Sequence, residues 1–142
     1  EELYGHLAQK TATFIGSILK DFVDGTISPI PQNDADATFT KLITTEDGKL
    51  DFLTQTADEL DQKIRALNPS PGTFFIADEK RIKVRHCKII EQSGTPGTFF
   101  DEGHTLTVYC LKNALQFEEV QPEGKQWMSS KSFLSGSGQK LI

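Results

Sequence analysis

The hydrophobic pattern changes period at Gly72, and this change constrains the fold more than any other feature of the chain. Before Gly72, apolar residues recur every three or four positions, as in helices; after it they alternate, as in strands. Turn signals rich in Gly, Pro and acidic residues divide this part into short segments. Strands are predicted over 73–77, 81–90, 98–101, 105–111 and 114–120. We therefore expect an α+β, mainly β fold built on a small, open, antiparallel β-barrel.

Two helices are predicted before the strands. The first has an apolar stripe between Leu3 and Phe22, followed by Gly25 at the expected place of a left-handed C-terminal cap. No earlier element can cover this stripe, and the chain opens without Met, so we expect a fragment whose helix partner is at least partly missing. The second helix begins at the capping box of Thr56 and Glu59 and ends at the Asn-Pro-Ser-Pro-Gly segment.

These signals divide the chain into four parts. The first helix (1–25) is followed by an extended linker (26–54) that carries two prolines at alternate positions. The barrel domain with its leading helix is expected over 55–136, and a short helix near its end would be capped by Ser129 or Ser130. The Gly/Ser-rich tail over 137–142 is expected to be loose.

The net charge of −5 hides an uneven distribution of charge. Residues 1–61 hold twelve acids and four bases, whereas residues 62–142 hold eight acids and eleven bases. An acidic average argues against a nucleic-acid partner, but the second part is net positive. Nine consecutive residues without an acid carry five cations: Lys80, Arg81, Lys83, Arg85 and Lys88.

In a strand, Arg81, Lys83 and Arg85 share one face, while Ile82 and Val84 face the core. Such a row suits a phosphate backbone, which is bound by salt-sensitive electrostatics rather than by base reading. A solvated strand face is an alternative of about equal weight. Because no aromatic residue is interleaved with the cations, backbone and shape contacts are expected rather than base stacking.

Neither a catalytic residue nor a metal site is predicted. His6, His86 and His104 are scattered, and they have no paired-ligand spacing to Cys87 or Cys110. The two cysteines fit small core or strand-face residues, reduced in a chain without an export signal, which indicates the cytoplasm. No apolar window is long enough for a membrane span.

Six segments, taken in order, resemble the methionyl-tRNA formyltransferases. Three of them, 28–32, 37–42 and 47–52, resemble that family's interdomain linker. The segment 64–72 is similar to its helix-to-barrel junction, with Ser70 where Trp is usual. Later barrel turns and the closing segment are matched by 96–98 and by 121–125 with 128–129 and 133–134. The resemblance covers about residues 3–136.

The resemblance implies that this is the C-terminal part of such an enzyme. Residues 3–24 would be the last helix of the formyltransferase domain, and residues 73–134 an open barrel of the oligonucleotide-binding (OB) type that helps to hold initiator tRNA. The family transfers a formyl group from 10-formyltetrahydrofolate to the amino group of methionyl-tRNA. Its catalytic Asn, His and Asp lie in the preceding domain, so no catalytic residue and no cofactor are assigned to this chain.

The expected partners are therefore initiator tRNA and the chain's own N-terminal catalytic domain, in a monomer. An alternative is a structural barrel that supports a related formyltransferase acting on small molecules. A self-standing single-strand binder is disfavoured by the missing aromatic platform and the unpartnered first helix. The candidates for tRNA contact are Lys41, Arg65, Arg81, Lys83, Arg85 and Lys125.

Overall fold

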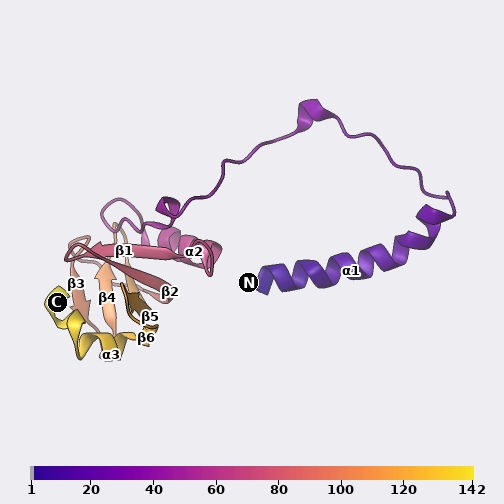
Figure 1. Cartoon of the computed structure of the whole chain (residues 1–142). Helices are drawn as coiled ribbons and strands as arrows, with labels where there is room; N and C mark the ends of the chain where they lie inside the picture. Colours follow the sequence, from indigo (N-terminus) through magenta and orange to yellow (C-terminus); the bar gives the residue numbers. More distant parts are fainter. Residues whose placement is uncertain (1) are drawn as a thin grey trace. The chain divides into compact units, whose positions relative to one another are not determined.

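The computed structural model describes residues 2–142, which fall into two units, one up to Leu42 and one over Ile43–Ile142 (Figure 1). The buried hydrophobic residues all belong to the second unit, which we call the β domain. Within residues 2–142, no helix is long and apolar enough to cross a membrane.

The first unit contains the predicted first helix, α1, over Glu2–Val23. Its C-terminus is closed as expected: Gly25 has a φ of +74°, and the amide of Thr26 donates to the carbonyl of Asp21 at 2.9 Å. None of its residues is buried, and the apolar stripe is exposed along the helix. The following segment contains one 3-10 turn, η1, over Asp34–Asp36.

The β domain is built on one antiparallel sheet of six strands with the order β1-β2-β5-β4-β3, in which β6 pairs with β5. The fold is thus α+β and mainly β, and the five expected strands are all present, with ends that differ by a few residues. The additional strand, β6, is two residues long. The bounds are β1 Thr73–Ala77, β2 Lys80–Ile90, β3 Phe99–Asp101, β4 Leu106–Tyr109, β5 Ala114–Pro122 and β6 Met128–Ser129.

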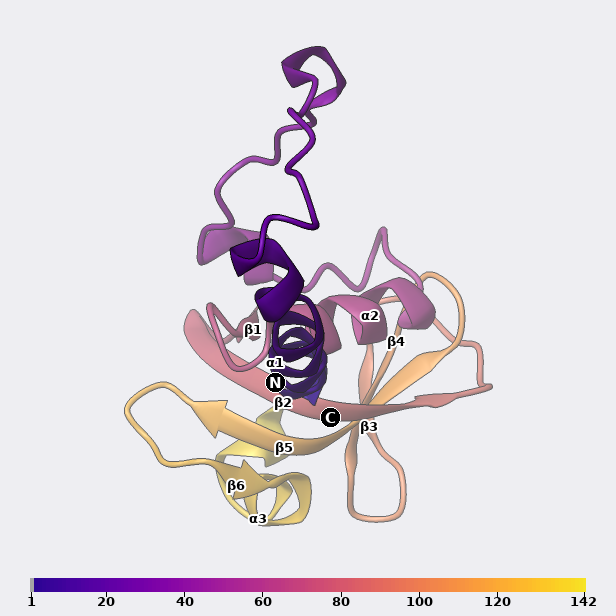
Figure 2. The ribbon, with the colours of Figure 1, turned by 90° about the vertical axis from the view of Figure 1, so that its right-hand side faces the viewer.

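Two helices lie at opposite ends of this sheet: α2 over Ala57–Leu67 and α3 over Ser130–Leu134 (Figures 1 and 2). The predicted capping box of α2 is confirmed, since the hydroxyl of Thr56 accepts from the amide of Glu59 and the carboxylate of Glu59 accepts from the amide of Thr56. The short helix α3 is capped by Ser129.

The core is centred on four phenylalanines that lie ring to ring. Phe75 stacks on Phe117 at 5.6 Å between ring centroids, and Phe52 meets Phe75 edge-on at the same distance. Phe99 completes the cluster. Aromatic pairs of this geometry contribute about 0.5–1.5 kcal/mol beyond their buried area.

Phe52 belongs to the segment assigned to the linker, so the compact unit begins earlier than residue 55. Leu50 is buried as well, and its amide donates to the carbonyl of Phe74 at 2.8 Å. The 3-10 turn η2, over Glu46–Gly48, precedes this contact. Residues 43–54 are therefore part of the β domain, because their apolar side chains fill its core and their backbone covers the outer edge of β1.

The tail is likewise more ordered than the sequence suggests. Ser137–Leu141 form the 3-10 helix η3, and Leu141 packs against the core. Gly138 lies so close to Phe133 that a Cβ there would be 2.6 Å from the ring. The expectation of a loose tail is wrong here because the Gly-rich segment lets the backbone approach the ring and return an apolar side chain to the core.

Candidate nucleic-acid interface

The outer face of β2 carries the cations that the sequence singled out. Ile82 and Val84 are buried, while Lys83 is exposed and Arg81 and Arg85 are half-exposed, so the predicted alternation of faces is confirmed. The pairing of β2 with β5 is regular up to Val84 and shifts register on either side of His86. The three cations therefore project from one side of β2, with Arg85 next to an irregularity of the sheet.

Arg81 is held by a carboxylate and by an aromatic ring. Its Nη2 lies 3.1 Å from Oε1 of Glu46, and its guanidinium carbon lies 3.9 Å from the ring centroid of Phe74. The side chains of Arg81 and Glu46 are 37% and 72% exposed. Arg81 is thus oriented by the ring and neutralised by the entering segment of the β domain.

Arg85 has the same combination of partners. Its Nε donates to Oε2 of Glu119, and its guanidinium lies 4.6 Å from the ring of Trp127. The hydrogen bond from Arg85 lowers the pKa of the Glu119 carboxyl, and the same bond raises the pKa of Arg85. Arg85 therefore anchors the β5–β6 connection to β2 and is less available to a ligand.

The remaining candidates differ in how free they are. Arg65 pairs with Asp61 on its own helix at 2.8 Å. Lys41 is exposed and lies in the first unit, outside the β domain. Within residues 2–142, no carboxylate lies within ion-pair distance of the ammonium groups of Lys83 and Lys125. These two lysines are the candidates whose charge is not already compensated.

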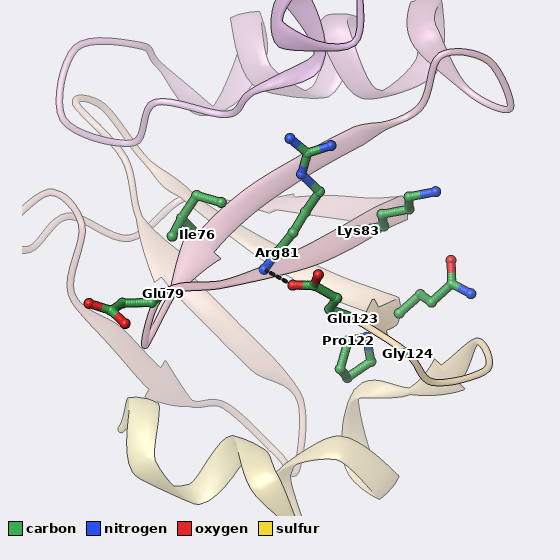
Figure 3. Close-up of a pocket in the computed structure, with 8 residues that line it drawn as sticks. Ile76, Glu79, Arg81, Lys83, Pro122, Glu123 and Gly124 are labelled. Carbon is green, nitrogen blue, oxygen red and sulfur yellow. Dashed lines mark hydrogen bonds between the residues drawn. The ribbon is translucent and has the colours of Figure 1, made fainter.

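A hollow of about 480 Å³ brings part of the candidate set together. Figure 3 shows Arg81 and Lys83 extending from β2 beside the turn that carries Glu123 and Gly124. Lys125 follows in the same turn, where its amide donates to the carbonyl of Pro122 at 3.0 Å. The lining residues are Ile76, Glu79, Arg81, Lys83, Gln121, Pro122, Glu123 and Gly124.

Several residues of this region could not be found from the sequence. Gln121 faces Lys83 across the β2–β5 pairing, and its amide nitrogen donates to the carbonyl of Lys125 at 2.9 Å. Glu46 and Phe74 meet Arg81 from other segments of the chain. No local pattern links these positions, because the contacts arise only when the segments pack.

The geometry around the two cysteines does not favour nucleophilic chemistry. Sγ of Cys87 lies 3.5 Å from Oδ1 of Asp61, and burial together with this carboxylate raises the pKa of Cys87 to about 12. Burial raises the pKa of Cys110 to about 12 as well. Neutral thiols of this kind are poor nucleophiles and poor metal ligands. Within the described residues, no group of three or more His, Cys, Asp or Glu could hold a metal ion.

Phe100 and Tyr109 form a half-exposed aromatic pair on β3 and β4, with ring centroids 4.4 Å apart. One side of the Tyr109 ring is covered by Gly94, where a Cβ would lie 2.4 Å from it. In the strand order, β4 and β5 separate this pair from the cations of β2. The stacking residues and the cationic residues are therefore on different parts of the sheet.

Comparisons with known proteins agree with this domain layout. A family model described as "Formyl transferase, C-terminal domain" matches residues 42–138. A methionyl-tRNA formyltransferase of Myxococcus xanthus is 33% identical over 141 residues, which cover 96% of this chain and 45% of that protein. One of Lachnospira eligens is 34% identical over 143 residues, with 95% and 45% covered. The chain thus spans less than half the length of these relatives.

Solved structures of HypX from Aquifex aeolicus share the fold. A variant of HypX superposes with a TM-score of 0.69 at 15% identity, over 90% of this chain and 23% of that one. HypX in complex with tetrahydrofolic acid superposes with a TM-score of 0.68 at 16% identity, over 87% and 22%. At these identities the likeness supports the fold alone. Since the family model matches more than half of its length, the chain belongs to the family of formyl transferase C-terminal domains.

Proposed function

We propose that this chain is the C-terminal part of a methionyl-tRNA formyltransferase and that its β domain positions initiator tRNA for the reaction. The family match and the names of the relatives support the parent activity. The observation that carries the tRNA role is the hollow beside β2, where Arg81 and Lys83 meet, with Lys125 next to it. We take the sheet to be a barrel of the OB type, a fold that often hosts oligonucleotides.

The division of labour follows from where the chemistry lies. The parent enzyme would transfer the formyl group of 10-formyltetrahydrofolate to the methionyl amino group in a preceding domain, in a cytoplasmic monomer. The β domain supplies no catalytic group and no metal ligand. Its contribution is positioning, which converts binding energy into a productive geometry at a distant centre.

We assign α1 to the catalytic domain. Its apolar stripe is exposed: Phe14 is 62% and Phe22 is 53% solvent-accessible. A 22-residue helix with such a face gains most of its stability from packing against a partner. The preceding domain of the parent enzyme is the partner whose covalent connection makes that contact intramolecular.

The contacts to tRNA would be made to phosphates. Lys83 and Lys125 carry uncompensated charges, and Arg81 offers a planar group suited to phosphate oxygens. Each such contact releases about one counterion, so binding weakens as salt is raised. The cations lie apart from the exposed aromatic pair, which favours backbone recognition over base stacking.

A structural support barrel is the second candidate, and the ion pairs favour it. Arg65, Arg85 and Lys88 are each matched by a carboxylate of the β domain, as expected for a solvated and internally balanced surface. In that case the β domain would hold its catalytic domain without touching nucleic acid.

Binding of initiator tRNA to the full chain, measured at two salt concentrations with heparin as a competitor, separates the two candidates. The double variant Lys83→Gln and Lys125→Gln should weaken tRNA binding and reduce the salt slope by about two counterions' worth. Lys131→Gln, on exposed α3 outside the hollow, is the matched control. Equal affinity for tRNA and heparin, together with an unchanged slope in the double variant, would refute the tRNA role.

A further inference from the structure

Arg81 stands at the junction of two structures. Its side chain lines the hollow, and its guanidinium also pairs with Glu46 of η2, at the point where the chain enters the β domain. Glu46 is thirty-five residues away in the sequence. A carboxylate of the same chain therefore occupies a cation of the candidate binding site.

The guanidinium is held in place independently of Glu46. Its carbon lies 3.9 Å from the ring centroid of Phe74, a buried residue of β1. The backbone of Arg81 is fixed as well: its carbonyl accepts from the amide of Glu123 at 3.0 Å, and its amide donates to the Glu123 carboxylate at 3.4 Å (Figure 3). If the carboxylate of Glu46 leaves, the guanidinium keeps its position and presents free N–H groups.

Glu46 can leave at little cost. It is 72% exposed, and exposed ion pairs contribute little net stability. The segment behind it stays attached without this pair, because Leu50 is buried and bonded to Phe74 and because Nζ of Lys63 donates to the carbonyl of Lys49 at 2.6 Å. Displacement of the Glu46 side chain would not detach the entering segment.

The neighbours of Arg81 in the hollow fit a single anionic group. Lys83 lies two residues along the same face of β2 and has an uncompensated charge. Glu79 and Glu123 line the hollow at the adjacent turns, so a chain of phosphates crossing both turns would be repelled. One phosphate placed against β2 meets two cations and avoids both carboxylates.

We propose that the hollow is a subsite for one phosphodiester group, and that this group replaces the carboxylate of Glu46 on Arg81 while Lys83 supplies the second charge. Glu46 thus acts as a built-in competitor that masks Arg81 until RNA is bound. A phosphate can engage the planar guanidinium with two parallel hydrogen bonds, which makes the exchange favourable. This inference rests on the proposed tRNA role of the β domain.

The test is Glu46→Gln in the full chain, with binding of initiator tRNA as the readout. Removing the competitor should tighten binding by about two- to fivefold at low salt, the range of an exposed ion pair. Glu91→Gln removes the same charge at the exposed end of β2, away from the hollow, and should give a smaller change. In an Arg81→Gln background, Glu46→Gln should give no gain.

Hydrogen exchange gives a second readout that a purely electrostatic effect would not move. The amides of Gly48 and Lys49 are bonded within η2, and the amide of Leu50 is bonded to Phe74. Bound tRNA should speed the exchange of the first two and leave Leu50 protected. Inorganic phosphate at matched ionic strength is the comparison arm: the same change with phosphate alone would assign the subsite to free phosphate and overturn the RNA assignment.

The failures of the two ideas are distinguishable. If Lys83→Gln and Lys125→Gln weaken tRNA binding while Glu46→Gln behaves like Glu91→Gln, the tRNA role stands and the masking is refuted. A gain from Glu46→Gln that persists without Arg81 also refutes it. Absence of tRNA binding in both the wild-type chain and Glu46→Gln would overturn both proposals.

Discussion

The ring of Phe52 meets the ring of Phe75 edge-on at 5.6 Å in the centre of the β domain. Phe75 belongs to β1, whereas Phe52 comes from the segment before α2 that has the composition of a linker. This contact makes residues 43–54 a structural part of the domain, and it suggests where the domain is most sensitive to substitution.

We expect Phe52→Ala to destabilise the β domain by about 3–5 kcal/mol, because it removes a buried ring from the aromatic cluster and leaves a cavity. The measurement is the free energy of unfolding from denaturant titration, followed by the fluorescence of the single Trp. Leu53→Ala is the control, since Leu53 is 64% exposed and should change stability by less than about 0.5 kcal/mol. Equal effects of the two variants would show that the segment does not pack as described.

Gly48→Ala should also destabilise the domain, by about 1–3 kcal/mol, through overpacking. A Cβ at Gly48 would lie 2.1 Å from the backbone oxygen of Gly72, so one of the two backbones must move. Gly16→Ala is the control: it lies inside α1 with open space around it, and there alanine favours the helix by about 1 kcal/mol. Thermal unfolding measured by circular dichroism checks both, and a tolerated Gly48→Ala would contradict the close approach.

The ion pair between Arg85 and Glu119 predicts a loss of stability in acid. The hydrogen bond from Arg85 holds the folded-state pKa of Glu119 below its usual 4.5, so the pair contributes fully above that value and is lost as the pH falls through the lowered pKa. The stability difference between wild type and Glu119→Gln should therefore shrink below pH 4.5.

Trp127 provides an independent readout of the same pair, because the guanidinium of Arg85 lies 4.6 Å from its ring. Its fluorescence should change over the same acid range before global unfolding. Glu118→Gln, which removes the exposed pair with Lys88, is the control and should leave the Trp127 transition unaltered. A stability difference that grows toward acid pH would reverse the sign of the argument.

Both cysteines should react slowly with a disulfide reagent at pH 8. Burial and the Asp61 carboxylate raise the pKa of Cys87 to about 12, and burial raises that of Cys110 to about 12, so little thiolate is present. We expect full reactivity only after denaturation. Asp61→Asn should speed modification of Cys87 and leave Cys110 unchanged, whereas fast labelling of both thiols in the folded protein would be incompatible with their burial.

Local patterns account for most of the secondary structure. The alternation of Ile82 and Val84 with cations defines the buried face of β2, and the capping box at Thr56 sets the start of α2. Gly25 has the positive φ that its place after α1 requires. These features could be predicted because each depends on residues within one turn or one strand.

The sequence by itself determined the mainly β character of the chain, its family and the placement of the cations on one face of β2. The tertiary structure alone decided which cations remain available: Glu46 reaches Arg81 and Glu119 reaches Arg85, from positions thirty-five and thirty-four residues away. It also decided that Phe52 and Leu141 belong to the core. The physical reason is that periodicity records only whether a side chain faces inward or outward, whereas its partner depends on strand register and packing between distant segments.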